Sequence, residues 1–180
     1  QRVFESFVDL TEQSIPGWLL ERAYGVVVVP NVVKAALTIG GRGGRGVMAV
    51  RHPDGQWSLP TFVTLAGVNF GFQFGVQSTD VVLVLMSRES VEGIAGGKVT
   101  LGADASVAAG PVGRTAQAST DAQLKASIYS YSRARGLFAG VALDGSVLHI
   151  DDAAGGAYYG NLPNMPPARV PESAVKLVDL

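Results

Sequence analysis

AALTIGGRGGRGVMAVR, residues 35–51, is the stretch on which the fold depends. Five of the seven residues from Gly40 to Gly46 are glycine, and the other two are Arg42 and Arg45. Apolar, strand-like runs flank the glycines on both sides. We therefore expect a glycine-rich bend between two strands of one sheet, with both arginines projecting from it.

Positive charge gathers in the same part of the chain. No acidic residue occurs between Glu21 and Asp54, although the net charge of the whole chain is only −1. Backbone N–H groups without a nearby Cβ can approach a phosphate, and arginine adds bidentate charge. A β-bulge with solvated arginines is an equally open interpretation. The predicted anion or lipid contacts are Lys34, Arg42, Gly43, Gly44, Arg45 and Arg51.

A second basic group follows in the last third of the chain. It consists of Arg114, Lys125, Arg133 and Arg135, with Asp121 as the only acidic residue between Asp104 and Asp144. We predict these arginines as secondary lipid contacts. Nucleic acid is not an expected partner, because the domain lacks the overall basicity that such binding requires.

Composition indicates a globular domain with a substantial core. The chain has 180 residues, of which 47% are hydrophobic and 16% charged. It contains no cysteine, which excludes disulfides, thiolate-bound zinc and thiol chemistry. We expect one domain over residues 1–160, with N-terminal helices in 2–23 and a sheet in 24–150. Residues 161–180 form a proline-rich tail with a short helix.

Local patterns predict many short strands and a few peripheral helices. Alternation from Val68 to Gln77 indicates one strand with three phenylalanines on one face. A strand from Tyr24 to Val29 should stop at Pro30, and Asp54-Gly55 and Asp144-Gly145 should each turn a hairpin. Helices are expected at residues 2–12, 17–23, 87–95, 153–159 and 172–180. The predicted fold class is α+β, mainly antiparallel β: a partly closed, glycine-rich sheet or barrel with short peripheral helices.

Enzymatic motifs are weak. Residues 41–46 satisfy G-x-G-x-x-G, but a strand follows them where a dinucleotide site needs a helix. Ser106, His149 and Asp151 could supply a hydrolase triad, yet no G-x-S-x-G elbow supports it. Metal binding by His149, Asp151 and Asp152 is not expected either, because adjacent residues on a strand point to opposite faces. We expect no catalytic residue, metal or cofactor, and keep a hydrolase as a third hypothesis.

Several long blocks resemble the SYLF domain family in order and spacing. They are VVVVPNVVKAALTIGGRGGRGVMAVR (26–51), DGQWSLPTFV (54–63), DVVLVLM (80–86), VTLGADASVAAGPVGR (99–114), IYSYSRARGLFAGVALDG (128–145) and AYYG (157–160). The resemblance covers residues 15–160. It is closest to the stand-alone bacterial form, without an SH3 or FYVE module.

The resemblance implies a lipid-binding module. The family is associated with phosphoinositides, with actin in its fungal members, and with no enzymatic activity. We therefore expect non-enzymatic binding of anionic lipid head groups at a membrane surface, with actin as a partner only in a eukaryotic context. A structural envelope protein or a carrier of an apolar ligand is the alternative.

The expected location is periplasmic or exported and membrane-associated, with the cytoplasm as the alternative. Bacterial members of the family often look exported. The chain also opens on Gln1, from which we expect that an N-terminal segment has been removed.

Overall fold

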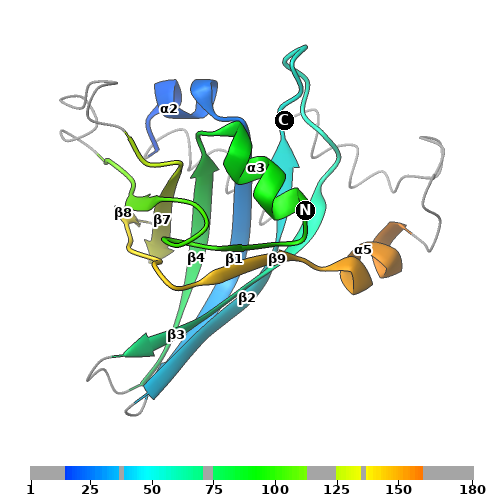
Figure 1. Ribbon diagram of the computed structural model, residues 1–180. Helices are drawn as coiled ribbons and strands as arrows, with labels where there is room; N and C mark the ends of the chain where they lie inside the picture. The colour runs from blue at the N-terminus through cyan, green and yellow to red at the C-terminus, as the bar shows by residue number, and fades with distance from the viewer. Residues whose placement is uncertain (1–14, 37–38, 71–74, 113–124, 135–136, 160–180) are drawn as a thin grey trace.

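The computed structural model describes residues 15–36, 39–70, 75–112, 125–134 and 137–159; for 34–36, 39–40, 68–70, 75–77, 137 and 159 it describes the backbone alone. These residues form one open, nine-stranded sheet with short helices (Figure 1), which confirms the predicted fold class. The strands are β1 (Gly25–Ala36), β2 (Ile39–Val50), β3 (Thr61–Phe70), β4 (Gly75–Leu85), β5 (Lys98–Thr100), β6 (Val107–Ala109), β7 (Ile128–Ala134), β8 (Leu137–Gly140) and β9 (Val147–Ile150). The helices are α2 (Gly17–Arg22), α3 (Arg88–Ala95) and α5 (Asp152–Tyr159).

The strand order is β5-β9-β3-β2-β1-β4-β7-β6, and β8 also pairs with β7. All pairings between these strands are antiparallel except β6 with β7. The long strands β1 to β4 are therefore the middle of the sheet, and the short strands extend it on both sides.

The central strands are covered on both faces, which explains their unbroken valine runs. Val27 and Val29 of β1 belong to a core that includes Ile94 of α3. Val28 belongs to a second core on the opposite face, with Leu19 of α2. In Figure 1, α2 and α3 lie over the same end of the sheet.

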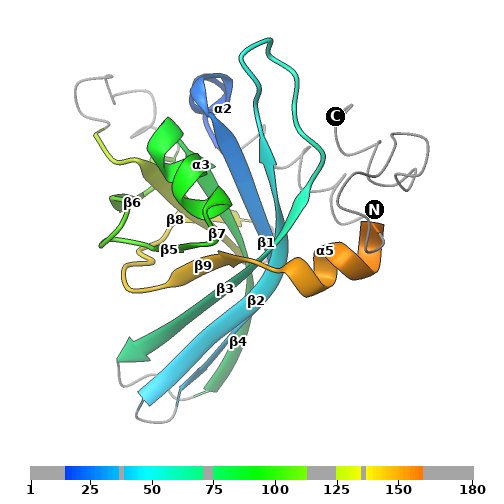
Figure 2. The ribbon, with the colours of Figure 1, turned by 45° about the vertical axis from the view of Figure 1, so that its right-hand side comes forward.

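Two halves of the sheet differ in this respect. The covered half contains residues 25–29 of β1 and its neighbours in β2, β3 and β4, next to α2 and α3. The projecting half consists of residues 33–36, 39–43, 66–70 and 75–79 of the same four strands. Figures 1 and 2 show it extending away from the described helices.

A bulge in β1 marks the boundary between the halves. The register of β1 shifts against β2 between Val28 and Val33, and against β4 between Val29 and Val32. Asn31 lies in this bulge with a φ of 53°, a left-handed conformation that asparagine tolerates. Its backbone N–H donates to Asp80 Oδ1 at 3.0 Å. The strand therefore continues past Pro30, and the prediction that it stops there is wrong.

The glycine-rich stretch is a strand, so the predicted bend is wrong. β2 pairs with β3 in unbroken register from Ile39 to Met48. A Cβ on Gly46 would lie 2.0 Å from the carbonyl oxygen of Val28, and one on Gly44 would lie 2.9 Å from Val29 Cγ1. At these two positions glycine is required because the bulged strand approaches closely, and not because the chain turns.

Two further strand predictions are also wrong. The alternating stretch from Val68 to Gln77 is divided between the end of β3 and the start of β4, which are not neighbours in the sheet. Asp144-Gly145 does turn the chain, with Gly145 at φ 78°. The strands on either side of it pair elsewhere, β8 with β7 and β9 with β3 and β5. Periodicity located these strand residues but could not identify their partners.

The other local predictions fare better. Helices occur at Gly17–Arg22, Arg88–Ala95 and Asp152–Tyr159, and the Ser87 hydroxyl caps the second by accepting from the Ser90 N–H at 3.1 Å. Asp54-Gly55 forms a tight turn with Gly55 at φ 87°, closed by the Arg51–Trp57 bridge. The helices predicted at 2–12 and 172–180 lie outside the described residues, so the domain limits stay a prediction.

Candidate functional site

Arg42 and Arg45 lie on opposite faces of β2. Arg42 pairs with Gly67 of β3. A Cβ on Gly67 would lie 3.3 Å from Arg42 Cγ, on the face of the sheet that carries the core with Val27 and Val29. Arg45 is opposite Thr64, and both contact Asp151. Residues three apart on a regular strand face opposite ways, so these two arginines do not form one joint cradle.

Arg42 is partly buried at the end of the first core. Its Nη1 donates to the carbonyl oxygen of Ala142 at 3.4 Å. Burial lowers the pKa of the Arg42 guanidinium, and the nearby Asp144 carboxylate partly opposes this effect. The side chain thus links β2 to the chain segment between β8 and β9.

Arg45 remains open to solvent. Its side chain is 81% exposed, and its Nε lies 3.6 Å from Asp151 Oδ2. The Thr64 hydroxyl donates to the same oxygen at 3.2 Å. The pKa of Asp151 is lowered chiefly by the backbone N–H of Ala154, against an opposing effect of burial, and further by Thr64 and Arg45.

Arg51 holds the end of α2. Its guanidinium donates to the carbonyl oxygen of Glu21 through Nη1, and to that of Leu20 at 3.0 Å through Nη2. These carbonyls belong to the last turn of α2, whose partial negative charge favours a cation. The guanidinium also stacks 4.6 Å above the centre of the Trp57 ring.

Of the remaining predicted residues, those whose side chains the structure describes do not join these arginines in one cluster. Arg133 of β7 lies 4.0 Å from Asp80 and 6.0 Å from the Phe138 ring. Gly43 and Gly44 are inside β2, and Lys34 pairs with Arg42 through its backbone in β1. Arg114 and Arg135 lie outside the described residues.

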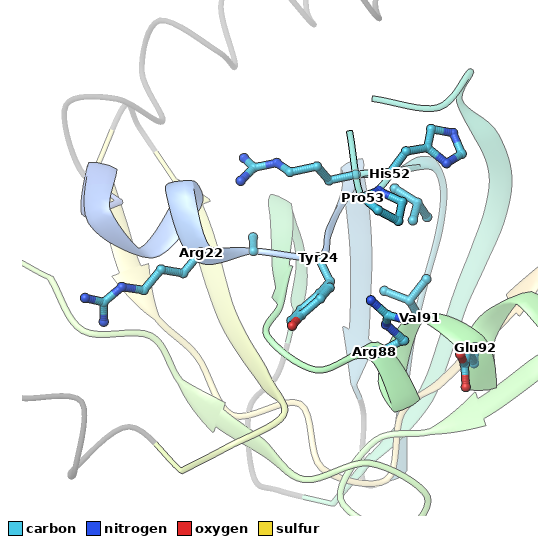
Figure 3. A pocket seen from close by; sticks show the side chains of 10 residues that line it. Arg22, Tyr24, His52, Pro53, Arg88, Val91 and Glu92 are labelled. Atoms are coloured by element: carbon cyan, nitrogen blue, oxygen red, sulfur yellow. The ribbon is translucent and has the colours of Figure 1, made fainter. Parts of the chain in front are cut away.

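A pocket lies where α2, β1, the end of β2 and α3 meet, at the covered end of the sheet. It has a volume of about 430 Å³, and Figure 3 shows its lining side chains. Its lining residues are Arg22, Ala23, Tyr24, Val50, Arg51, His52, Pro53, Arg88, Val91 and Glu92. Only Arg51 of these belongs to the predicted site.

The pocket combines positive charge with an apolar lining. Three arginines and one glutamate give it a net charge of +2 with His52 neutral. Val50, Val91 and Pro53 supply aliphatic surface, and Tyr24 is 42% exposed. In Figure 3, Arg88 lies beside Tyr24 and Val91, whereas Glu92 lies farther along α3. This arrangement suits an anionic group joined to an apolar body.

Each of the three arginines that line the pocket lies over an aromatic ring. We call the pocket the arginine pocket. Arg22 lies 5.6 Å from the centre of the Trp18 ring, and Arg88 lies 5.9 Å from that of Tyr24. Arg51 over Trp57 completes the set. In a cation–π stack the guanidinium keeps its positive charge, which can attract an anion. Arg51 already donates through Nη1 and Nη2 to carbonyl oxygens of α2.

Comparison with known proteins supports the resemblance seen in the sequence. The profile of a family described as "Ysc84: Las17-binding protein actin regulator" matches residues 66–173. The chain belongs to the Ysc84 family of SYLF domains.

Relatives of this SYLF domain include proteins of animals and yeast. The rat "SH3 domain-containing YSC84-like protein 1" is 36% identical over 153 residues, or 82% of this chain and 45% of the relative. "Protein YSC84" of Saccharomyces cerevisiae is 38% identical over 168 residues, covering 89% and 36%. "LAS seventeen-binding protein 3" of the same yeast is 37% identical over 153 residues, covering 83% and 33%.

The chain spans less than half the length of these relatives. They are eukaryotic, so they give no support to the expected bacterial and periplasmic form. The family is one of binding and regulatory domains. None of the described helices of this SYLF domain is long and apolar enough to cross a membrane.

Sequence reasoning missed Arg22 and Arg88 of this pocket. Arg22 was recoverable, because it lies inside the acid-free window that begins after Glu21. No such signal marks Arg88. It comes after β4, far in sequence from the acid-free window, and it reaches the pocket only through the packing of α3.

The hydrolase hypothesis would need the Ser106 hydroxyl to bond with His149. Both described hydrogen bonds of that hydroxyl are with Ser127.

Proposed function

We propose that this SYLF domain is a non-enzymatic module that binds anionic lipid head groups in the arginine pocket. The observation that carries the proposal is that Arg22, Arg51 and Arg88 all line one open pocket together with aliphatic side chains. The positive charge of these guanidinium groups would attract a phosphate, and the glycerol end of the lipid would contact Val50 and Val91. Family membership supports a binding role over a catalytic one.

The strength of such binding can be estimated. A basic residue near an anionic membrane contributes about 1 kcal/mol, so three arginines give weak, salt-sensitive attachment. Arg51 is held in place by α2 and costs little to order, whereas Arg22 and Arg88 are more exposed. We therefore expect Arg51 to position the ligand, and the other two arginines to supply most of the salt dependence.

Vesicle co-sedimentation tests the proposal. Arg22→Glu/Arg88→Glu should reduce binding to phosphatidylserine or phosphoinositide vesicles at least about tenfold, because both contacts become repulsive. The matched control is Lys98→Glu/Lys125→Glu, which changes the net charge equally at exposed sites outside the pocket. Equal loss in both variants would show that only overall charge matters. Binding to neutral vesicles that ignores salt would favour the apolar-carrier alternative.

The contacts predicted along β2 remain a separate prediction. Arg42→Glu/Arg45→Glu tests them in the same assay, and we expect a smaller loss than from Arg22→Glu/Arg88→Glu. Arg42 is occupied by the carbonyl of Ala142, and Arg45 lies beside Asp151. A larger loss would move the binding site from the pocket to the strand.

Actin is a second candidate partner. The matching profile and one relative are named for Las17 or "LAS seventeen" binding, and the profile description adds actin regulation. Co-sedimentation with filamentous actin tests this candidate, with or without anionic vesicles. Competition between the two ligands would place them on one surface, and additive binding would place them apart.

A further inference from the structure

Glu92 distinguishes the arginine pocket from a uniformly basic site. Among the lining residues that the structure describes, Glu92 is the only acidic one. Its side chain is exposed, and the ion pairs of Asp80 and Asp151 do not involve it. Within the described part of the chain, its carboxylate forms no hydrogen bond. The pocket therefore presents a carboxylate that a ligand can reach.

This carboxylate is not paired with the arginine one turn before it. Arg88 precedes Glu92 by four residues on α3, a spacing at which opposite charges can pair. The Arg88 guanidinium instead lies over the Tyr24 ring, 5.9 Å from its centre. In Figure 3, Arg22 and Glu92 lie on opposite sides of the group of lining side chains. The pocket is thus basic on one side and acidic on the other.

A site with this charge pattern discriminates among phosphate ligands. A ligand whose only charged group is a phosphate would leave the Glu92 carboxylate unpaired. A ligand that also carries a primary ammonium would pair with it, because an ammonium has N–H donors and no acceptor. Electrostatic complementarity of this kind contributes more to specificity than to affinity.

We propose that the arginine pocket selects phospholipid head groups whose phosphate is joined to a primary ammonium, as in phosphatidylserine and phosphatidylethanolamine. This inference rests on the proposed function, because it takes the arginines as the phosphate contacts. The positive charge of Arg22 and Arg88 would hold the phosphate, and the Glu92 carboxylate would accept N–H groups of the ammonium. A head group with further phosphates in place of the ammonium is disfavoured beside Glu92.

Vesicles of equal surface charge test this selectivity. Phosphatidylserine and phosphatidylglycerol have the same net charge near neutral pH, but only phosphatidylserine has an ammonium group. At equal mole fractions in phosphatidylcholine, the 180-residue chain should bind phosphatidylserine vesicles at least about threefold more tightly, as expected of an exposed ion pair. Glu92→Gln should abolish this difference, because an amide carries no charge. The matched control is Glu89→Gln, an exposed position of α3 outside the pocket, which should keep the difference.

The outcomes separate this selectivity from the function on which it rests. If the unmodified chain bound neither kind of vesicle, the proposed function itself would be overturned. Equal binding to both would leave the proposed function intact and overturn the selectivity. A preference for phosphatidylserine that persisted in Glu92→Gln would assign it to the serine carboxylate, and would overturn the role of Glu92.

Soluble head groups test recognition without a difference in the membrane. Glycerophosphoethanolamine has no net charge and glycerophosphoglycerol is anionic, so the net positive charge of the pocket alone favours the second compound. We expect the first to displace the chain from phosphatidylserine vesicles at an at least about threefold lower concentration. Glu92→Gln should remove this advantage. The opposite order in the unmodified chain, or displacement by neither compound, would overturn the proposal.

Discussion

The covered and projecting halves of the sheet share four strands but place different demands on their residues. Within β2, a Cβ on Gly46 would lie 2.0 Å from a backbone oxygen, whereas one on Gly43 would lie 3.7 Å from the nearest atom, the Leu65 carbonyl oxygen. Glycine is thus a packing requirement at one position and replaceable at the other. The same glycine-rich sequence therefore holds one glycine that packing requires and one that can be replaced. Only the close approach of β1 to Gly46 distinguishes them.

This difference predicts in which half of the sheet substitutions are tolerated. In the covered half, valines of β1 are buried on both faces and α2 and α3 fix the arginine pocket. In the projecting half, the contacts to other described elements are few and include those of Arg42 with Ala142 and of Ala66 with Val147. The bulge at Asn31 and the contacts of Asp80 and Asp151 lie near the boundary between the halves.

The largest expected effect is from Gly46→Ala. The new Cβ would overlap the Val28 carbonyl oxygen, so the backbone of β1 or β2 must shift. We expect the free energy of unfolding to fall by about 3 kcal/mol or more. Chemical denaturation measures it, with Gly43→Ala as the control, for which a change below about 1 kcal/mol is expected. Equal losses would erase the distinction between the two halves.

An intermediate effect is expected from Asp80→Ala. Asp80 accepts the N–H of Asn31 and lies 4.0 Å from Arg133, so its loss frees the bulge. The free energy of unfolding should fall by about 1 kcal/mol, and hydrogen exchange of the Asn31 amide should accelerate. Asp54→Ala removes a comparable bond to the Gln56 N–H in an exposed turn. Unchanged exchange at Asn31 would show that Asp80 does not hold the boundary.

The smallest expected effect concerns pH and Asp151. The pKa of its carboxyl group is lowered in the folded protein, first by the Ala154 N–H and also by Thr64 and Arg45. Because this pKa is lower in the folded than in the unfolded protein, the ionised carboxylate stabilises the fold at pH values above the unfolded-state pKa. This stabilisation is lost as the pH falls below about 4. Asp151→Asn should therefore flatten the decline of stability between pH 6 and pH 3. Thermal denaturation across this pH range measures the effect, with Asp152→Asn as the control. Coinciding stability profiles of the two variants would contradict the assignment to Asp151.

Local chemistry made several elements predictable. The Ser87 cap and the closing glycines located α3, and the β-branched runs located the buried parts of β1 and β4. Antiparallel pairing followed from the many short strands. These features depend on residues close together in sequence, for which propensity and capping are sufficient information.

Features that depend on distant residues were not predictable. Nothing near Gly46 in sequence says that Val28 approaches it, and nothing near Arg88 says that α3 packs beside Arg51. The opposite orientation of Arg42 and Arg45 was available from strand parity, but the expectation of a bend concealed it. The anion site was therefore sought along β2, and its strongest candidate lies at the end of that strand.

The stacking of arginines on aromatic rings gives the molecule a built-in optical reporter. Its two tryptophans, Trp18 and Trp57, lie under Arg22 and Arg51, two of the three pocket arginines. An anion that draws either guanidinium away from its indole alters the emission of that ring. Ligand titrations can thus be followed by intrinsic fluorescence without a label, and Trp57→Phe assigns the remaining signal to Trp18.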